Sequence, residues 1–327
     1  MPYDNFPNYD IDVVFTWVDG DDDDHRKKLN AYLNPNQKKN NQTALKNRYN
    51  QINEIEYAIK SILKNATYVR NIFIVTDNQT PLFLKNLDSD HKLFSKVKII
   101  DHKTIFKGYE QYLPTFNSRA IETLLYKIPD LAEHFLYFND DFFLLGKTRP
   151  EDFFEKGQPV LRGKWSKFEE DVLYKQILSI LKIKKVNKKR AGHKRAQQKG
   201  AKILGFNRYY KFHHTPSPLR KSTFQHFFKE NKHLEEENIK YKLRNVNQFL
   251  PHGLINHVEI KNNTCVLKND YQLVYFGSYK KPLIWFKLML NINELRKNKL
   301  FLNMQNLTSC PESKLQYIVQ WLKDKFN

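Results

Sequence analysis

Short apolar runs that end at acidic residues are the feature that most constrains the fold of this chain. The run at 12–18 is rich in Val, Phe and Trp and leads into Asp19, and the run at 135–138 leads into Asp140 and Asp141. Runs of β-branched and aromatic residues predict buried strands. In open α/β sheets, ligands bind beyond the carboxyl ends of the strands. The sequence therefore predicts a sheet edge rich in carboxylates, suited to a divalent cation and a phosphate-bearing substrate.

Helix-type and strand-type patterns alternate along the first half of the chain. Apolar residues recur at helical spacing over 50–64, strand-type runs follow at 71–76 and 97–100, and a second helical pattern covers 118–126. This order predicts an α/β fold in which helices flank a mostly parallel sheet. The polar stretch 25–47 predicts a loop over the strand ends.

The composition favours a globular chain without the marks of a secreted or membrane-spanning protein. Its 327 residues are 40% hydrophobic and 14% aromatic, which predicts a packed core. No run approaches the ~20 apolar residues that span a bilayer, and the polar residues 1–10 are unlike a signal peptide. Two cysteines, Cys265 and Cys310, are too few for a disulfide framework. We therefore expect a cytoplasmic protein.

The chain carries a large excess of positive charge. Its 55 Lys and Arg residues against 35 Asp and Glu residues give a net charge of +20. This excess predicts an anionic partner, such as a charged polymer or the inner face of the plasma membrane. The basic run at 182–202 contains no acidic residue and is either a solvated segment or an accessory surface. Because no RNA-recognition, zinc-finger or basic-zipper pattern occurs, we expect no nucleic acid partner.

Long strings around the two acidic clusters match the motifs of a known family. They read IDVVFTWVDG at 11–20, FNSRAIE at 116–122 and YFNDDFF at 137–143. These strings resemble the Stealth family, the bacterial capsular polysaccharide phosphotransferases, which are related to the lysosomal-enzyme GlcNAc-1-phosphotransferase of animals. Weaker similarity lies in HHTP at 213–216, with Arg244 downstream, and in KLFLNM at 299–304. The resemblance covers about 11–145, 208–255 and 297–325.

The resemblance implies transfer of a hexose-1-phosphate from a nucleotide sugar to a hydroxyl of a glycan acceptor in capsular or cell-surface polysaccharide synthesis. The products are a phosphodiester and a nucleoside monophosphate, and UDP with an N-acetylhexosamine is the family's commonest donor. Such chemistry needs a metal and Arg or Lys to offset charge. Mg²⁺ or Mn²⁺ would find oxygen ligands in the acidic clusters. We therefore expect a Rossmann-like or GT-A-like nucleotide-sugar core with helical and basic insertions.

The motif match assigns one group of residues to the donor. Asp19 and Asp22 are expected to contact the nucleotide sugar or its metal. Asn117, Ser118 and Arg119 stand at a predicted helix start, where N–H groups and a guanidinium suit a diphosphate. Capping by Ser118 beside a surface Arg119 is the simpler alternative.

A second group is expected to carry the chemistry. His214 matches the family's motif histidine and is the candidate general base, with the adjacent His213 as the alternative. Arg244 matches an arginine that would stabilise phosphate charge. Asp140 and Asp141 are expected to bind the metal, and one of them, Asp141 in the catalytic assignment, could instead orient the acceptor. His252 and His257 lie nearby in the sequence, but nothing assigns them to the site.

One region departs from the family pattern. The family usually carries Leu-Asn-Asp where this chain has Leu302, Asn303 and Met304. Because methionine is a poor ligand for a hard cation, either the acid comes from elsewhere or Asn303 and the Asp140–Asp141 pair serve instead.

We expect a single catalytic domain over 1–327, with a core at about 1–158 completed by about 206–327, and a basic insertion at about 160–205. Two other functions stay open. A metal-dependent GT-A-type glycosyltransferase would use the same acidic strand ends but would form a glycoside without phosphorus. A non-catalytic protein that binds nucleic acid or an anionic polymer would not depend on Asp19, Asp140 or Asp141, and its binding would fall steeply with salt.

Overall fold

A five-stranded sheet forms the centre of the molecule in the computed structural model, which describes residues 9–33, 52–85, 95–171 and 192–326. The strand order is β3-β2-β1-β4-β9, with neighbours from β3 to β4 parallel and β9 antiparallel to β4. The strands are β1 (Ile11–Thr16), β2 (Val69–Thr76), β3 (Val97–Asp101), β4 (His134–Phe138) and β9 (Ser217–Arg220). The predicted α/β class with a mostly parallel sheet is therefore confirmed.

Strand β1 lies in the middle of the sheet, between β2 and β4, and its side chains are buried on both faces. Val13 and Phe15 pack into one apolar cluster, and Val14, which points to the opposite face, packs into a second. A parallel sheet buries both faces when helices cover them. The near-continuous apolar run in the sequence follows from this burial.

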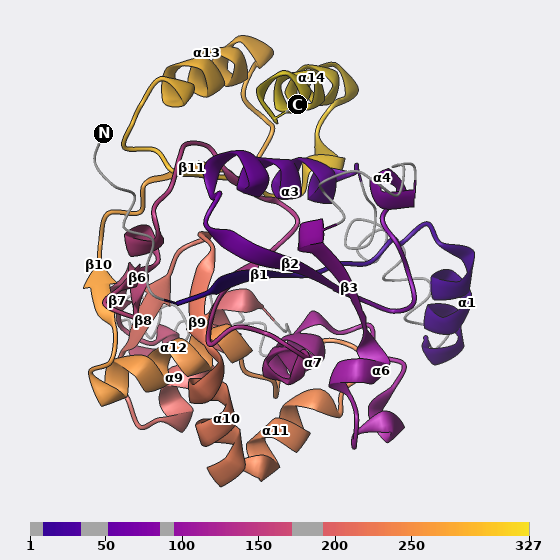
Figure 1. Ribbon diagram of the computed structural model, residues 1–327, viewed down its shortest axis with the longest axis vertical. Coiled ribbons are helices and arrows are strands. Elements are labelled where there is room, and N and C mark those ends of the chain that lie inside the picture. The colour runs from indigo at the N-terminus through magenta and orange to yellow at the C-terminus, as the bar shows by residue number, and fades with distance from the viewer. Residues whose placement is uncertain (1–8, 34–51, 86–94, 172–191, 327) are drawn as a thin grey trace, which may run out of the picture.

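Helices cover both faces of the central sheet, as Figure 1 shows. On one face lies α3 (Glu54–Asn65), joined by α13 (Leu283–Glu294) and α14 (Glu312–Phe326). The other face carries α7 (Ser118–Thr123), α10 (Lys221–Glu230) and α12 (Pro251–Asn262). The remaining described α-helices are α1 (Asp23–Tyr32), α4 (Leu82–Lys85), α6 (His102–Ile105), α9 (His193–Ile203) and α11 (Lys232–Ile239).

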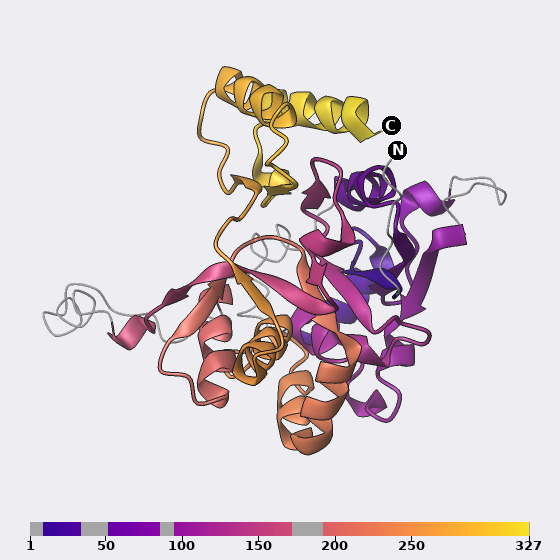
Figure 2. The same ribbon diagram turned by 60° about the vertical axis from the view of Figure 1, so that its left-hand side comes forward.

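Two smaller sheets connect distant parts of the chain (Figure 2). One contains β6 (Phe154–Glu155), β7 (Gln158–Ser166), β8 (Tyr209–Phe212) and β10 (Val266–Lys268). The other contains β5 (Phe142–Leu144), β11 (Leu273–Phe276) and β12 (Phe301–Met304). Because β12 pairs with β5, it brings Asn303 opposite Phe142, next to the second acidic cluster.

The prediction of a loop at 25–47 was wrong at its start. Residues Asp23–Tyr32 form α1, because the Asp22 side chain accepts a hydrogen bond from the His25 N–H at 2.8 Å and caps the helix. Residues 34–47 lie outside the described part of the chain. The predicted helix at 118–126 ends as an α-helix at Thr123 and continues as a 3₁₀ turn over Leu125–Lys127.

The basic insertion is described in part. Its end forms α9, which packs against α12, whereas residues 172–191, including Lys188, Lys189 and Arg190, lie outside the described residues. The division into a core and an insertion stays a prediction. Among the residues that the structure describes, none of the helices has the length and hydropathy to cross a membrane.

Candidate active site

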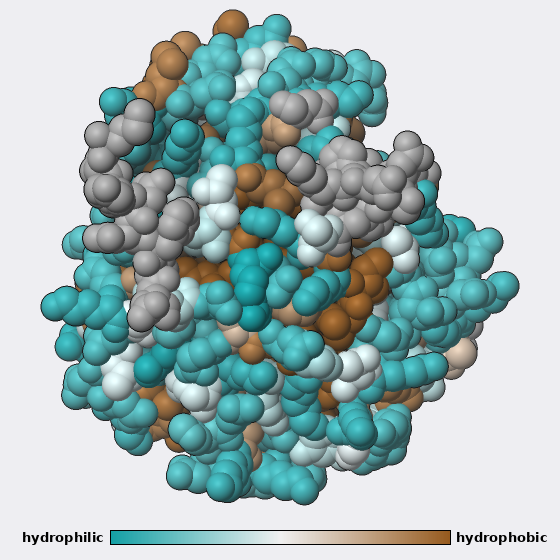
Figure 3. Space-filling model, viewed as in Figure 1, coloured by the Kyte–Doolittle hydropathy of each residue, from teal (hydrophilic) through white to brown (hydrophobic). Residues whose placement is uncertain are grey.

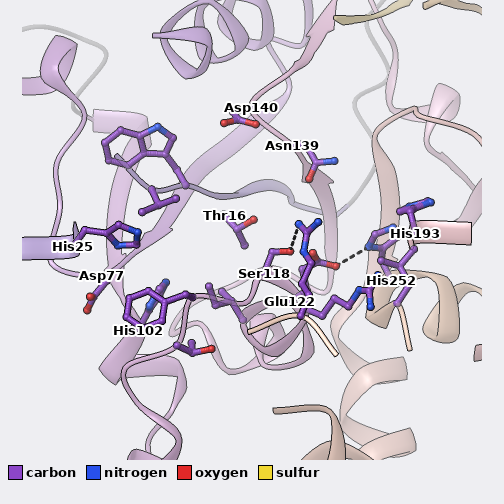
Figure 4. Close-up of a pocket in the computed structure, with 18 residues that line it drawn as sticks. Thr16, His25, Asp77, His102, Ser118, Glu122, Asn139, Asp140, His193 and His252 are labelled. Atoms are coloured by element: carbon purple, nitrogen blue, oxygen red, sulfur yellow. Dashed lines mark hydrogen bonds and ion pairs between the residues drawn. The ribbon is translucent and has the colours of Figure 1, made fainter. Parts of the chain in front are cut away.

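A cavity of about 210 Å³ opens where the parallel strands end at their carboxyl side. Thr16 ends β1, Asp77 follows β2, His102 follows β3, and Asn139 and Asp140 follow β4, and all five residues line the cavity. Figure 4 shows them around a common space. The chain order thus collects polar residues from four strands at one edge, as expected for ligand binding in an open α/β sheet.

Three of the residues assigned from the sequence to phosphate binding line this cavity together: Ser118, Arg119 and Arg244. Arg244 Nη2 donates to Ser118 Oγ at 2.9 Å. The Arg119 guanidinium donates to the backbone oxygens of Asn245 at 3.3 Å and Gly192 at 3.2 Å. These bonds join the start of α7 to two segments from the second half of the chain. Two guanidinium groups and a hydroxyl at one wall suit a diphosphate.

Asn117 does not line the cavity. It is completely buried and caps α7, accepting from the Arg119 N–H at 3.2 Å. Its amide nitrogen donates to the Tyr241 carbonyl and to Gln248 Oε1, both at 2.9 Å. The structure therefore places Asn117 behind the site, where it holds α7 against the segment that contains Arg244.

A histidine–carboxylate pair in the cavity was missed by sequence reasoning, which left His252 outside the site. His252 Nδ1 lies 3.1 Å from Glu122 Oε2, and both side chains line the cavity. The Tyr137 ring lies 5.4 Å from the His252 ring. A carboxylate beside an imidazole orients it for proton transfer or for binding anions. Since 130 positions separate the two residues, no local pattern could have paired them.

His214, the predicted general base, lies beside the cavity rather than in its wall. Its ring is 5.4 Å from the ring of His193, which lines the cavity, and stacks on Tyr275 at 5.3 Å and 7°. Burial, with the charge of His213 as the next cause, lowers the pKa of His214 to about 4. The imidazole is therefore neutral near pH 7, as a base must be. His213 stacks instead on Tyr271, with the ring centroids 4.4 Å apart.

The two predicted metal ligands face different surroundings. Asp140 lines the cavity, whereas Asp141 Oδ1 is buried without a hydrogen-bond partner among the described residues. Burial, followed by the charge of Asp140, raises the pKa of Asp141 to about 7. Glu54 is buried as well, and burial and then the charges of Asp140 and Asp141 raise its pKa well above the usual range. Glu54 is a further acid of this region that sequence reasoning did not assign.

Met304, where the family usually carries an acid, is buried in the structure. Met304 is completely buried in the apolar cluster under β12. Asn303, which points to the other face of this strand, is also completely buried, and its amide nitrogen donates to the Asp141 carbonyl at 3.3 Å. The position of the family's acid is therefore part of the core in this chain.

The described wall of the cavity offers a metal ion few protein ligands. Among the described residues, no three His, Cys, Asp or Glu side chains are grouped so that they could hold a metal. Asp140 and Asn139 offer oxygen donors in the cavity wall. Mg²⁺ is commonly held by one or two carboxylates plus substrate phosphates. The donor set thus fits a cation that binds together with a diphosphate.

Asp19 and Asp22 form the turn between β1 and α1 and do not line the cavity. The side-chain amide of Gln79 bonds both the N–H and the carbonyl of Asp19, at 2.9 and 3.0 Å. Asp19 Oδ1 accepts from the Asp21 N–H at 2.9 Å, and Asp22 caps α1 through His25 N–H. That backbone bond is the main reason that the pKa of Asp22 is lowered. The turn carries His25 to the cavity wall.

The far end of the cavity is formed by His25, Asp77 and His102, which Figure 4 shows across from His193 and His252. His102 is buried, and neither of its ring nitrogens has a hydrogen-bond partner among the described residues. Burial lowers the pKa of His102 to about 4, against the opposing charges of Asp77 and Asp101. The cavity lining also includes the rings of Trp17 and Phe116, and the Phe116 ring lies 5.4 Å from that of His25. A buried imidazole in a cavity that also has aromatic walls suits a planar, polar ligand.

Comparison with known families matches two segments of the chain. Residues 9–36 match Stealth protein CR1, conserved region 1, and residues 48–161 match Stealth protein CR2, conserved region 2. A capsular polysaccharide phosphotransferase of Neisseria meningitidis serogroup B is 43% identical over 151 residues, which are 46% of this chain and 39% of that protein. An exopolysaccharide phosphotransferase of Nocardia farcinica is 35% identical over 226 residues, which are 68% of this chain and 40% of that protein. The chain thus matches about two fifths of the length of these relatives.

Solved structures similar to this chain are glycosyltransferases with low sequence identity. The galactosyltransferase LgtC in complex with donor and acceptor sugar analogues has 11% identity and a TM-score of 0.43, with 96% of this chain and 95% of that chain covered. Mouse xyloside xylosyltransferase 1 has 9% identity and a TM-score of 0.43, with 92% and 100% covered. Likeness at this level does not bear on activity. By sequence, the chain carries conserved regions 1 and 2 of the Stealth proteins and is related through them to the capsular polysaccharide phosphotransferases.

Proposed function

We propose that this protein transfers a hexose-1-phosphate from a nucleotide sugar to a hydroxyl of a glycan acceptor. The observation that carries the proposal is one cavity in which Ser118, Arg119 and Asp140, from the second Stealth region, meet Arg244 and His252, from the second half of the chain. The names of the relatives support phosphotransfer in capsule or exopolysaccharide synthesis. N-acetylhexosamine-1-phosphate, delivered by UDP-GlcNAc, is the first candidate for the transferred group. Since nucleotide sugars are intracellular donors, we propose a cytoplasmic enzyme.

The proposed reaction needs positioning and charge neutralisation more than covalent chemistry. The acceptor hydroxyl oxygen attacks the phosphorus nearest the sugar, and the bond from this phosphorus to the bridging oxygen of the diphosphate breaks. The hydroxyl proton passes to neutral His214, and the nucleoside monophosphate leaves. Arg119 and Arg244 offset the charge on the phosphate oxygens.

A divalent cation, Mg²⁺ or Mn²⁺, belongs to the proposal. Asp140, with Asn139 beside it, would hold it at the cavity wall together with the diphosphate. When bound, the cation neutralises negative charge on the diphosphate. Asp141, whose Oδ1 is buried and which does not line the cavity, would act on the acceptor side or through Asp140.

The two ends of the cavity give the donor a direction. We propose that the nucleoside lies at the end formed by His25, Asp77 and His102, between Trp17 and Phe116. The diphosphate would then reach Ser118, Arg119 and Asp140, and the sugar would point toward the three histidines His193, His214 and His252. Calorimetry with UMP and with uridine checks this direction: His102→Gln should weaken both ligands by a similar factor. If only UMP binding weakens, the phosphate, and not the base, lies at the His102 end of the cavity.

Phosphorus NMR of the purified protein with UDP-GlcNAc, Mg²⁺ and a short capsule-like acceptor tests the function. We expect a new phosphodiester resonance together with release of UMP, and neither signal with Asp140→Asn. A panel of UDP- and CMP-linked sugars extends the test to other donors. Release of UDP with formation of a glycoside would instead establish the alternative, a metal-dependent GT-A-type glycosyltransferase.

A further inference from the structure

Helix α13 presents an apolar stripe to solvent. The exposed fractions of Ile284, Leu288 and Leu295 are 70%, 53% and 84%. Leu295 directly follows the helix as its C-cap and keeps helical backbone angles. At about 100° per residue, the three positions therefore fall within roughly 40° of arc on one side of the helix. Single exposed apolar residues are ordinary on protein surfaces. Three on one side of the same helix, with the exposed Asn291 between Leu288 and Leu295, form a patch that marks an interaction surface. Figure 3 shows hydrophobic residues gathered over α13 at the upper left of the molecule.

The opposite side of α13 attaches the helix to the protein. Phe286 and Leu290 are buried and belong to the apolar cluster shared with α3 and α14. Both lie about 200–240° around the helix from Ile284, so the stripe points directly away from the core. Figure 2 shows α13 and α14 at one extremity of the molecule, away from the central sheet. The helix therefore has one apolar side for packing and a second that faces outward.

Basic residues surround the stripe. Between 280 and 299 the chain has six basic residues and one acidic residue, Glu294, which pairs with Lys325 at 2.9 Å. The exposed basic residues at the two ends of the helix are Lys280, Lys281, Arg296 and Lys297. An apolar stripe flanked by Lys and Arg is the pattern of helices that lie in the interface of an anionic bilayer. Protein–protein interfaces, in contrast, are depleted in lysine.

We propose that α13 docks this protein on an anionic lipid bilayer, with Ile284, Leu288 and Leu295 inserted among the lipids and the flanking cations on the headgroups. The surface lies close to the site along the chain. Strand β11 carries Tyr275, which stacks on His214, and only residues 277–282 separate this strand from α13. One part of the inference rests on the proposed function: the enzyme would reach its acceptor at the membrane surface, with the His214 end of the cavity toward that surface.

Vesicle flotation tests the docking without any need for catalysis. The full chain is mixed with vesicles of equal parts phosphatidylcholine and phosphatidylglycerol, and with vesicles of phosphatidylcholine alone. We expect binding to the anionic vesicles, and at least about a tenfold weaker partition for I284Q/L288Q/L295Q. The matched control is L82Q/L267Q, which changes residues that are 56% and 41% exposed elsewhere and should bind as the unchanged protein does. K280Q/K281Q/R296Q/K297Q should lose the part of the binding that salt weakens.

Several outcomes would overturn the inference. Absence of wild-type binding to anionic vesicles is one, and equal binding by the triple variant is another. A dimer in sedimentation velocity that the triple variant abolishes, without vesicle binding, would assign the stripe to self-association. An unchanged melting temperature shows that the variants are folded. Phosphodiester formation on a soluble acceptor should be unaffected by the triple variant, so a failed activity assay with intact docking counts against the proposed function alone.

Discussion

At the scale of single residues, Asp12 shows how one carboxylate can organise the start of the sheet. It is completely buried, and Oδ1 accepts from Arg70 Nε and the Asn71 N–H, both at 3.0 Å. Oδ2 accepts from Arg70 Nη2 at 2.6 Å and from the Ala132 N–H at 2.7 Å. The bonds join β1 to the beginning of β2 and to the segment before β4. An acid near the beginning of an apolar strand thus has a structural role.

Replacement of Asp12 by Ala should destabilise the fold strongly. The substitution removes the buried acceptor of two backbone N–H groups and of Arg70 Nε, although Arg70 keeps its bonds to Asp10 and to the Asp130 carbonyl. We expect a cost of about 3–5 kcal/mol. Urea unfolding monitored by circular dichroism measures this change. Asp10→Ala is the matched control, because Asp10 contacts the same Arg70 but is exposed, and it should cost below about 1 kcal/mol. Equal effects of the two substitutions would contradict the account.

Substitutions of the two histidines His214 and His252 should have different effects on turnover and on donor affinity. If His214 accepts the acceptor proton, His214→Ala lowers kcat by about 10²–10⁴ with little effect on donor affinity. His252→Ala, which breaks the pair with Glu122 in the cavity, should raise the Kd for the nucleotide sugar as well as lower turnover. Donor affinity is measured by calorimetry and kcat by phosphodiester formation. The reverse pattern would transfer the role of the base to His252.

At the scale of secondary-structure elements, the turn from β1 to α1 connects the acidic motif to the cavity. Gln79, which follows β2, holds the backbone of Asp19 through two hydrogen bonds. Asp22 then starts α1, and the first turn of this helix presents His25 to the cavity, with the Phe116 ring 5.4 Å away in an edge-on contact. The aspartates of this motif therefore act on the site through the geometry of a turn.

Asp22→Ala should weaken nucleotide binding through the loss of a helix cap. Removing the cap costs about 1 kcal/mol, and fraying of the first turn of α1 would displace His25 from the nucleoside end. We expect a slightly lower melting temperature and a several-fold higher Kd for UMP by calorimetry. Asp24→Ala, an exposed acid in the same turn, serves as the control and should leave UMP binding unchanged. A loss of Mg²⁺ dependence in Asp22→Ala would instead make this residue a metal ligand.

At the scale of the whole molecule, the cavity joins two parts of the chain that are far apart in sequence. Ser118 and Arg244, 126 positions apart, share a hydrogen bond, and His252 reaches Glu122 across 130 positions. The antiparallel strand β9 and helix α12 carry the second half back against the sheet. Binding and charge neutralisation at this edge depend on both halves.

Metal dependence should appear only with the nucleotide. Because the described residues contain no preformed group of metal ligands, Mg²⁺ alone should leave the melting temperature unchanged. Mg²⁺ with UDP-GlcNAc should raise stability by about 2.7 kcal/mol when the donor is at a hundred times its Kd. EDTA should abolish turnover, and Mg²⁺ or Mn²⁺ should restore it. A rise in melting temperature with Mg²⁺ alone would show that a metal site exists without the donor.

Buried histidines should make the fold sensitive to mild acid. Burial lowers the pKa of His257 from 6.5 to about 4. The unfolded chain therefore binds the extra proton, and stability falls as the pH drops from about 6.5 to about 4, by about 1.4 kcal/mol per pH unit for each such group. Asp141, whose pKa is raised to about 7, acts in the opposite direction.

His257→Gln isolates one of these groups, because the measured quantity is the slope of stability against pH rather than stability itself. Between pH 6.5 and 4 the slope of the unfolding free energy against pH should fall by about 1.4 kcal/mol per pH unit, which corresponds to one proton fewer taken up on unfolding. Urea titrations at a series of pH values provide it. Parallel curves for wild type and His257→Gln would mean that His257 does not bind a proton on unfolding.

The local sequence determined the parallel strands and the edge at which the site lies. Strand β1 could be predicted from its run of apolar residues because burial on both faces requires it, and the acids that follow mark the strand ends. The strings around Asp19, Ser118 and Asp140 also indicated the family, because they are contiguous.

The tertiary structure decided what each polar residue contacts. Asp140 and Asp141 are neighbours in sequence, yet Asp140 lines the cavity, whereas Asp141 does not and has a buried Oδ1. Glu122 and His252 became a pair only through the packing of α7 against α12. The apolar residues of α13 are visible in the sequence, but only packing decides which of them face solvent. Local patterns report burial and strand ends, whereas pairs and exposed faces depend on contacts between residues far apart in the chain.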